Sequence, residues 1–138
     1  MDIKVETPGN EVYEYLNAQL VRANHESSSW SNDAFTVALR DENGALIGGV
    51  RGITNMGLVE VRGLWIDPPH RGGGTGTHLM ALLEAHALSL GATRAALYTY
   101  EWQARSFYEK LGYIVYGTLD FPAGAKRYYM QKDLKAPD

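Results

Sequence analysis

The chain has 138 residues, enough for one domain with a sizeable core, and we expect a single domain over 1–138. Its net charge of −3 argues against a general nucleic-acid binder. The lack of cysteine excludes disulfides, a thiolate nucleophile and a zinc–thiolate site. We find neither an apolar stretch long enough to span a membrane nor the apolar region of a secretory signal. These features predict a cytoplasmic protein that binds neither nucleic acid nor membranes.

The first half of the chain predicts one helix followed by an antiparallel meander. Apolar residues at nearly helical spacing indicate a helix over 11–24, and a polar, loop-like stretch follows at 25–33. The sequence Asp-Glu-Asn-Gly at 41–44 is a strong hairpin signal, and a second turn is expected at 55–57. The strands predicted around these turns are 35–40, 45–54 and 58–67.

The second half predicts alternating helices and strands. An amphipathic helix is expected over 77–90, with a shared apolar face made of Leu79, Leu82, Leu83, Ala87 and Leu90. The later elements are a strand at 95–100, a short helix at 104–111, and strands at 113–119 and 126–134. A strand–helix–strand unit is right-handed and joins parallel strands, so 58–67 and 95–100 should be parallel. We therefore expect an α/β (α+β) fold: a mixed, mostly antiparallel sheet with one parallel pair and helices on both faces.

The run Arg71-Gly72-Gly73-Gly74-Thr75-Gly76 lies where a predicted strand leads into a predicted helix. Glycines there let backbone N–H groups approach a ligand, and the helix N-terminus adds a positive dipole end, which together suit a phosphate or pyrophosphate. No lysine follows the glycines, so the run is not a P-loop. Its spacing also fails the Gly-x-Gly-x-x-Gly pattern of dinucleotide-binding folds.

The remaining pattern is Arg/Gln-x-x-Gly-x-Gly/Ala, which Arg71, Gly74 and Gly76 fit. Here the chain resembles the GNAT superfamily of acyl-CoA-dependent N-acetyltransferases. The segment Leu-Trp-Ile-Asp-Pro-Pro-His-Arg-Gly at 64–72 is similar to the approach to that family's pyrophosphate loop. Ala104 and the run Phe-Tyr-Glu-Lys-Leu-Gly-Tyr at 107–113 are similar to its second signature. The resemblance implies the acyl-CoA N-acyltransferase fold, in which the two parallel strands splay apart.

The resemblance also implies acetyl-CoA as co-substrate. Its pyrophosphate would lie on the glycine loop, and its pantetheine amides would pair with the edge of the preceding strand. Glu101 stands where the family often has asparagine, and we expect it to cap the short helix instead. The three nearby histidines form no credible metal set, so no metal is predicted. The predicted cofactor-binding residues are Leu64, Trp65, Ile66, Arg71, Gly72, Gly73, Gly74, Thr75, Gly76 and Thr77.

Without a cysteine or an evident Ser/His/Asp arrangement, direct attack of an amine on the thioester is the simplest mechanism. Tyr108 matches the family's tyrosine that protonates the departing thiolate. Glu60 lies where some family members carry a catalytic glutamate, and alternation places it on one strand face with Arg62, Leu64 and Ile66. An ordered water chain is the open alternative for the base.

The acceptor is expected to be a primary amine of a small molecule. The resemblance places His25 and Trp30, in the loop after the first helix, beside the acceptor pocket. Tyr100 and Trp102 follow the second splayed strand and are expected to line the acceptor cleft. Two alternatives stay open: an enzyme for protein or peptide amines, and a non-catalytic acyl-CoA-binding sensor or partner subunit. The family also commonly forms homodimers through its C-terminal strands.

Overall fold

The computed structural model describes residues 1–7 and 9–135, which divide into two compact units. The first unit, residues 1–31, contains helix α1 (Asn10–Ser27). This helix confirms the predicted one but extends three residues further, through His25 to Ser27, into the stretch predicted as loop. Among the described residues, no helix has the length and apolar content needed to cross a membrane.

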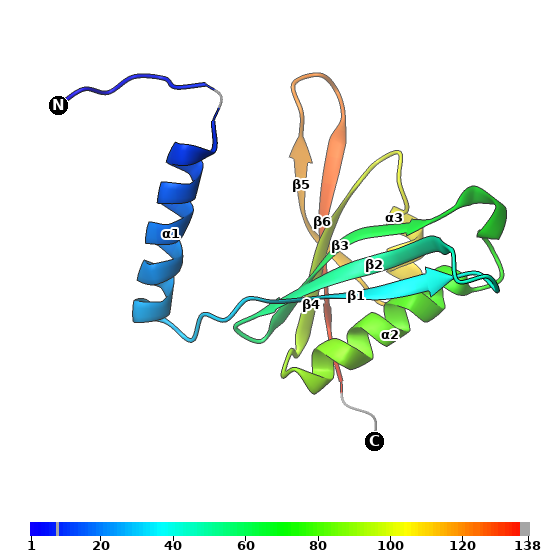
Figure 1. Cartoon of the computed structure of the whole chain (residues 1–138). Helices are drawn as coiled ribbons and strands as arrows, with labels where there is room; N and C mark the ends of the chain where they lie inside the picture. The colour runs from blue at the N-terminus through cyan, green and yellow to red at the C-terminus, as the bar shows by residue number, and fades with distance from the viewer. Residues whose placement is uncertain (8, 136–138) are drawn as a thin grey trace. The chain divides into compact units, whose positions relative to one another are not determined.

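Residues 32–138 form the second unit, which is built on one six-stranded sheet with strand order β1-β2-β3-β4-β6-β5 (Figure 1). Each element predicted for this unit is present, with ends that lie within two residues of those predicted. The bounds are β1 Asp33–Arg40, β2 Leu46–Asn55, β3 Leu58–Ile66, the 3-10 helix η1 Pro68–His70, α2 Thr75–Ser89, β4 Arg94–Tyr100, α3 Arg105–Lys110, β5 Ile114–Asp120 and β6 Lys126–Asp133.

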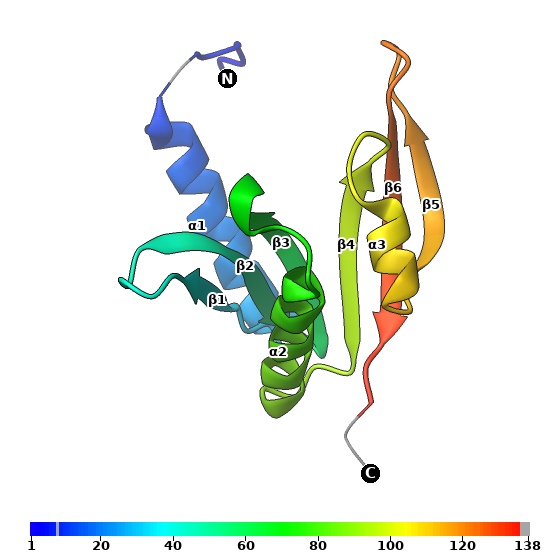
Figure 2. The ribbon, with the colours of Figure 1, turned by 90° about the vertical axis from the view of Figure 1, so that its right-hand side faces the viewer.

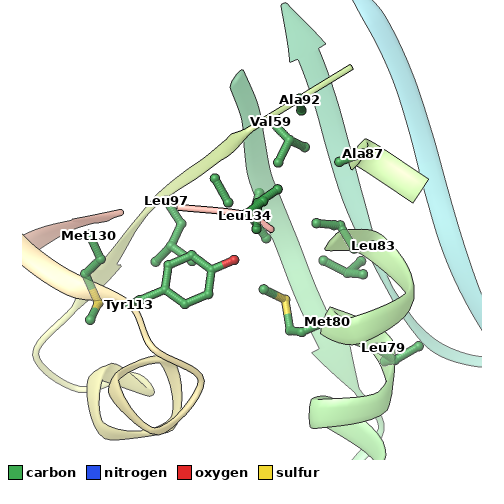
Figure 3. Close-up of a cluster of buried hydrophobic side chains, with 13 residues drawn as sticks. Val59, Leu79, Met80, Leu83, Ala87, Ala92, Leu97, Tyr113, Met130 and Leu134 are labelled. Atoms are coloured by element: carbon green, nitrogen blue, oxygen red, sulfur yellow. The ribbon is translucent and has the colours of Figure 1, made fainter. Parts of the chain in front are cut away.

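The core of this unit lies between the sheet and α2, and α3 packs on the same face (Figures 2 and 3). The α2 residues that it contains are Leu79, Met80, Leu83 and Ala87. The predicted apolar face is therefore partly wrong, since Leu82 is 46% exposed and Leu90 follows the last residue of the helix. At 100° per residue, the buried stripe extends from Leu83 toward Met80, whereas Leu82 lies on the other side of Leu83.

Strands β3 and β4 are parallel, as predicted, but they pair at one end only. The register covers the first three residues of β3, Leu58–Glu60. From Val61 onward the two strands separate, and Figure 2 shows the β3 and β4 ribbons running apart. Within the described strands, the backbone groups on this edge of β3 have no ladder partner in β4. An extended ligand can therefore pair with them.

A bulge lies in the separated part of β3. Between two paired positions, Val50 of β2 stands opposite two β3 residues, Gly63 and Leu64. Gly63 has a φ of 66°, the left-handed conformation that glycine adopts without strain. An extra residue of this kind bends the strand and shifts the alternation of its side chains by one position.

The bulge overturns one prediction about β3. After Gly63, Leu64 and Ile66 pack against the core, whereas Glu60 and Arg62, before the bulge, point to the opposite face and are exposed. The shared face predicted for these four side chains is therefore wrong. Simple period-two alternation fails here because it assumes a strand without an inserted residue.

Candidate functional site

The glycine run forms a loop of left-handed residues that leads into α2. Gly72, Gly73 and Gly74 have φ angles of 92°, 66° and 83°. A Cβ on any of them would meet nothing within 4 Å, so backbone conformation rather than space requires glycine here. Gly74 is the N-cap of α2, and no side chain caps this helix. Its first N–H groups and its positive dipole end are therefore left for an anionic ligand.

Gly76, in the first turn of α2, is needed for a different reason. A Cβ there would lie 3.2 Å from two ring atoms of Phe107 in α3, closer than ordinary van der Waals contact. The missing side chain lets the N-terminus of α2 approach α3. The two glycines of the Arg71-x-x-Gly74-x-Gly76 pattern thus satisfy a backbone requirement and a packing requirement.

Arg71 ties the glycine loop to the end of β3. Its Nε donates a hydrogen bond of 2.7 Å to the carbonyl oxygen of Ile66. The guanidinium carbon also lies 4.6 Å from the centre of the Trp65 ring, a cation–π distance. These contacts place a positive charge beside the loop, where it would favour a bound phosphate.

A cavity of about 460 Å³ opens between the glycine loop, the end of β3 and the start of α3. All the predicted cofactor residues except Gly73 line it, and Ala104 and Phe107 add the α3 side. The cavity adjoins the cleft between the splayed strands, because Leu64, Trp65 and Arg71 are among the residues that line both. A long ligand can therefore extend from the helix N-terminus into the gap between β3 and β4.

The cleft between β3 and β4 has a volume of about 600 Å³ and contains Tyr108 in its wall. The Tyr108 ring packs against Phe107 and Tyr113 in edge-to-face contacts, with centroids 5.1 and 5.9 Å away. Burial raises the pKa of the Tyr108 hydroxyl above its usual 10.0. A tyrosine hydroxyl whose pKa is no lower than 10.0 carries its proton at neutral pH, as a proton donor must.

Glu60 lies next to this cleft rather than in its wall. Its Oε2 accepts a hydrogen bond of 2.9 Å from Arg62 Nη2, and its side chain is 48% exposed. The cavity that it lines also contains Tyr116 and Tyr129. The structure thus places Tyr108 and Glu60 on adjoining cavities rather than together in one. The assignment of Glu60 as the base stays a prediction.

The side of the cleft formed by β4 and the turn after it is aromatic. It contains Tyr100 and Trp102, both named from the sequence, together with Tyr98. The Tyr100 ring is stacked on Trp102, with centroids 4.7 Å apart and planes 9° apart. Alternation along β4 already places Tyr98 on the same strand face as Tyr100. Arg127, by contrast, reaches Tyr100 only because β6 pairs with β4, which local sequence does not specify.

Three other sequence predictions have different outcomes. His25 and Trp30 belong to the unit of residues 1–31, and their role beside the acceptor stays a prediction. The capping role of Glu101 is wrong, because Ala104 is the N-cap of α3 and makes no side-chain hydrogen bond. Instead, Gln103 Oε1 accepts a hydrogen bond of 3.1 Å from the Tyr100 N–H, which closes the turn after β4. No group of three or more potential metal ligands occurs in the described residues.

Known proteins share both the sequence pattern and this architecture. Residues 8–113 match the acetyltransferase (GNAT) family. A blasticidin-S acetyltransferase from Streptomyces morookaense is 34% identical over 95 residues, which cover 67% of this chain and 70% of that protein. An acetyltransferase from Bacillus cereus ATCC 14579 has a TM-score of 0.84 and 26% identity, over 96% of this chain and 98% of that one.

A crystal structure of aminoglycoside 6'-N-acetyltransferase complexed with coenzyme A also has the same fold. Its TM-score is 0.67 with 24% identity, and the match covers 76% of each chain. The glycine loop, the splayed parallel strands and the tyrosine of the short helix all occur in this chain in the order that the family pattern predicts. The protein belongs to the GNAT family of acetyltransferases.

Proposed function

We propose that the protein transfers the acetyl group of acetyl-CoA to a primary amine of a small molecule. One observation carries the proposal: the loop at the start of α2 and the unpaired edge of β3 open onto a cavity that continues into the cleft lined by Tyr108. A phosphate site, an edge for strand-like pairing and a neutral hydroxyl thus follow one another along a single path.

Each part of acetyl-CoA has a counterpart on this path. The pyrophosphate would accept hydrogen bonds from the N–H groups at the start of α2, with Arg71 adding positive charge. The pantetheine amides would pair with the β3 backbone beyond Val61, where β4 has moved away. The aminoglycoside acetyltransferase that contains coenzyme A supports this route through its shared fold.

The chemistry needs a neutral amine and a proton for the departing thiolate. The amine nitrogen attacks the thioester carbonyl, forms the C–N bond, and the C–S bond then breaks. Tyr108 would donate its proton to the CoA sulfur, since its hydroxyl carries that proton at neutral pH. The amine proton leaves to Glu60 or to solvent. No acyl-enzyme is needed, and the chain has no cysteine to form one.

Two relatives support a small-molecule acceptor. One is named for blasticidin S and another for an aminoglycoside. The test is incubation of the protein with acetyl-CoA and a panel of small amines, with thiol release and acetylated product measured together. Acetylation of a small amine supports the proposal. Stabilisation by CoA without turnover of small amines, lysine peptides or peptide N-termini would point to a sensor. Turnover of the peptides alone would show that the acceptor is a protein or peptide amine rather than a small molecule.

A further inference from the structure

Aromatic side chains gather around Arg127 on the sheet face opposite the core. On β4, Tyr98 and Tyr100 alternate with the buried Leu97 and Thr99, so they point away from α2. Antiparallel pairing sets Arg127 of β6 beside Tyr100. The Arg127 guanidinium lies 4.7 to 5.8 Å from the centres of four rings, those of Tyr98, Tyr100, Phe121 and Tyr129.

Arg127 holds these rings in place. Its Nη1 donates a hydrogen bond of 3.3 Å to the hydroxyl of Tyr100, and its Nη2 donates one to the hydroxyl of Tyr129. These bonds and the surrounding ring faces fix a side chain that would otherwise be flexible. Tyr100 is therefore anchored through its hydroxyl as well as through its backbone N–H, which is bonded to Gln103.

Trp102 extends this anchored cluster into the cleft. One face of its indole is stacked on Tyr100, and among the described residues it makes no other ring contact. Trp102 is nevertheless 66% exposed and lines the same cleft as Tyr108. A large flat ring, supported from behind and open in front, offers a surface that another flat ring can stack on.

We propose that Trp102, supported by Tyr100 and Arg127, is a stacking platform for a planar ring of the acceptor, so that the enzyme prefers small amines carrying an aromatic or heteroaromatic ring. The inference rests on the proposed function, because it assigns a part of the acceptor to a wall of the same cleft. An apolar pocket without a stacking platform would have a different preference, since it would bind a saturated ring at least as strongly as a flat one.

The experiment compares two amines that differ in ring planarity. 3-Phenylpropylamine and 3-cyclohexylpropylamine have the same linker, and the ring is too far from the nitrogen to change its basicity much. We expect kcat/KM to favour the phenyl amine by about threefold to tenfold, the range of aromatic pair energies. Trp102→Leu should remove this preference, chiefly through KM for the phenyl amine.

The matched control is Tyr116→Leu. Tyr116 is also an exposed aromatic residue, at 56%, and its ring contacts Tyr129, but it does not line the cleft. This variant should keep the wild-type preference. Equal use of the two amines by the wild type, a preference for the cyclohexyl amine, or a preference that survives Trp102→Leu would each overturn the platform.

A binding readout separates this inference from the proposed function. Tryptophan fluorescence of the CoA-saturated protein should change on titration with the phenyl amine, and the Trp102→Leu variant should lose that change. Stabilisation by CoA together with binding of neither amine would overturn the platform alone. Failure of CoA to stabilise the protein would instead overturn the cofactor assignment.

Discussion

Two adjoining regions, the cavity at the glycine loop and the β4 side of the cleft, are built differently. The region proposed for the cofactor consists mainly of backbone: three left-handed glycines, the uncapped start of α2 and the unpaired edge of β3. The region proposed for the acceptor consists of side chains: Tyr98, Tyr100 and Trp102, with Arg127 bonded to Tyr100. A backbone site recognises groups that every acyl-CoA carries, whereas side chains can change without changing the fold. Changes of side chain in the acceptor region would therefore leave the backbone of the cofactor region intact.

The largest expected effect is at Tyr108, in the wall of the cleft. Tyr108→Phe removes the proton donor and keeps the ring contacts with Phe107 and Tyr113, so we expect kcat to fall by about 100-fold or more. CoA affinity measured by calorimetry should stay unchanged. A variant with nearly full kcat would show that the thiolate takes its proton from elsewhere.

Gly74→Ala tests the glycine loop at the start of α2, and Gly57→Ala is its control. Both glycines have a φ of 83°, and a Cβ on either would meet nothing within 4 Å. Each substitution should therefore lower the free energy of unfolding by about 1–2 kcal/mol. Only alanine at 74 should turn the loop N–H groups away from the ligand, and we expect CoA to bind about tenfold more weakly. Equal CoA affinity in the two variants would show that the glycine loop does not bind CoA.

Glu60→Gln should have a smaller effect, because its half-exposed carboxylate is paired with Arg62 and water can carry the amine proton. We expect kcat/KM to fall by less than about tenfold, below the range of a positioned base. The measurement is a pH–rate profile of the variant beside the wild type. A loss of 100-fold or more would instead establish Glu60 as the base.

The smallest effect concerns alkaline stability. Burial raises the pKa of both Tyr108 and Tyr113, so the folded protein holds these protons above pH 10.0 while the unfolded chain releases them. The contribution of these two tyrosines to the free energy of unfolding is complete below pH 10.0 and is lost as pH rises further, by up to about 1.4 kcal/mol per pH unit for each tyrosine. Tyr108→Phe should lose stability less steeply above pH 10.0 in urea unfolding. An identical slope would mean that the hydroxyl is not buried in solution.

The sequence predicted the glycine loop and the start of α2 well, because the determinants of their conformation are local. A glycine run between a strand and a helix predicts residues with positive φ at the positive end of the helix dipole. The motif spacing from Arg71 indicated which glycines occupy the motif positions. It failed where a single inserted residue mattered: the bulge at Gly63 turned Leu64 and Ile66 away from the face of Glu60. The sequence also could not predict the contact of Arg127 with Tyr100, on which Trp102 is stacked, since it depends on pairing between strands distant in the chain.

The central claim is that the glycine loop and the free edge of β3 bind acyl-CoA, and the most direct test is urea unfolding of the wild-type protein with CoA and, separately, with ATP. CoA at one hundred times its dissociation constant should raise the free energy of unfolding by about 2.7 kcal/mol. ATP shares a charged phosphate chain but lacks the pantetheine arm that β3 would pair with. At the same concentration as CoA, it should therefore raise the free energy of unfolding much less. No rise with CoA, or an equal rise with both ligands, would contradict the assignment.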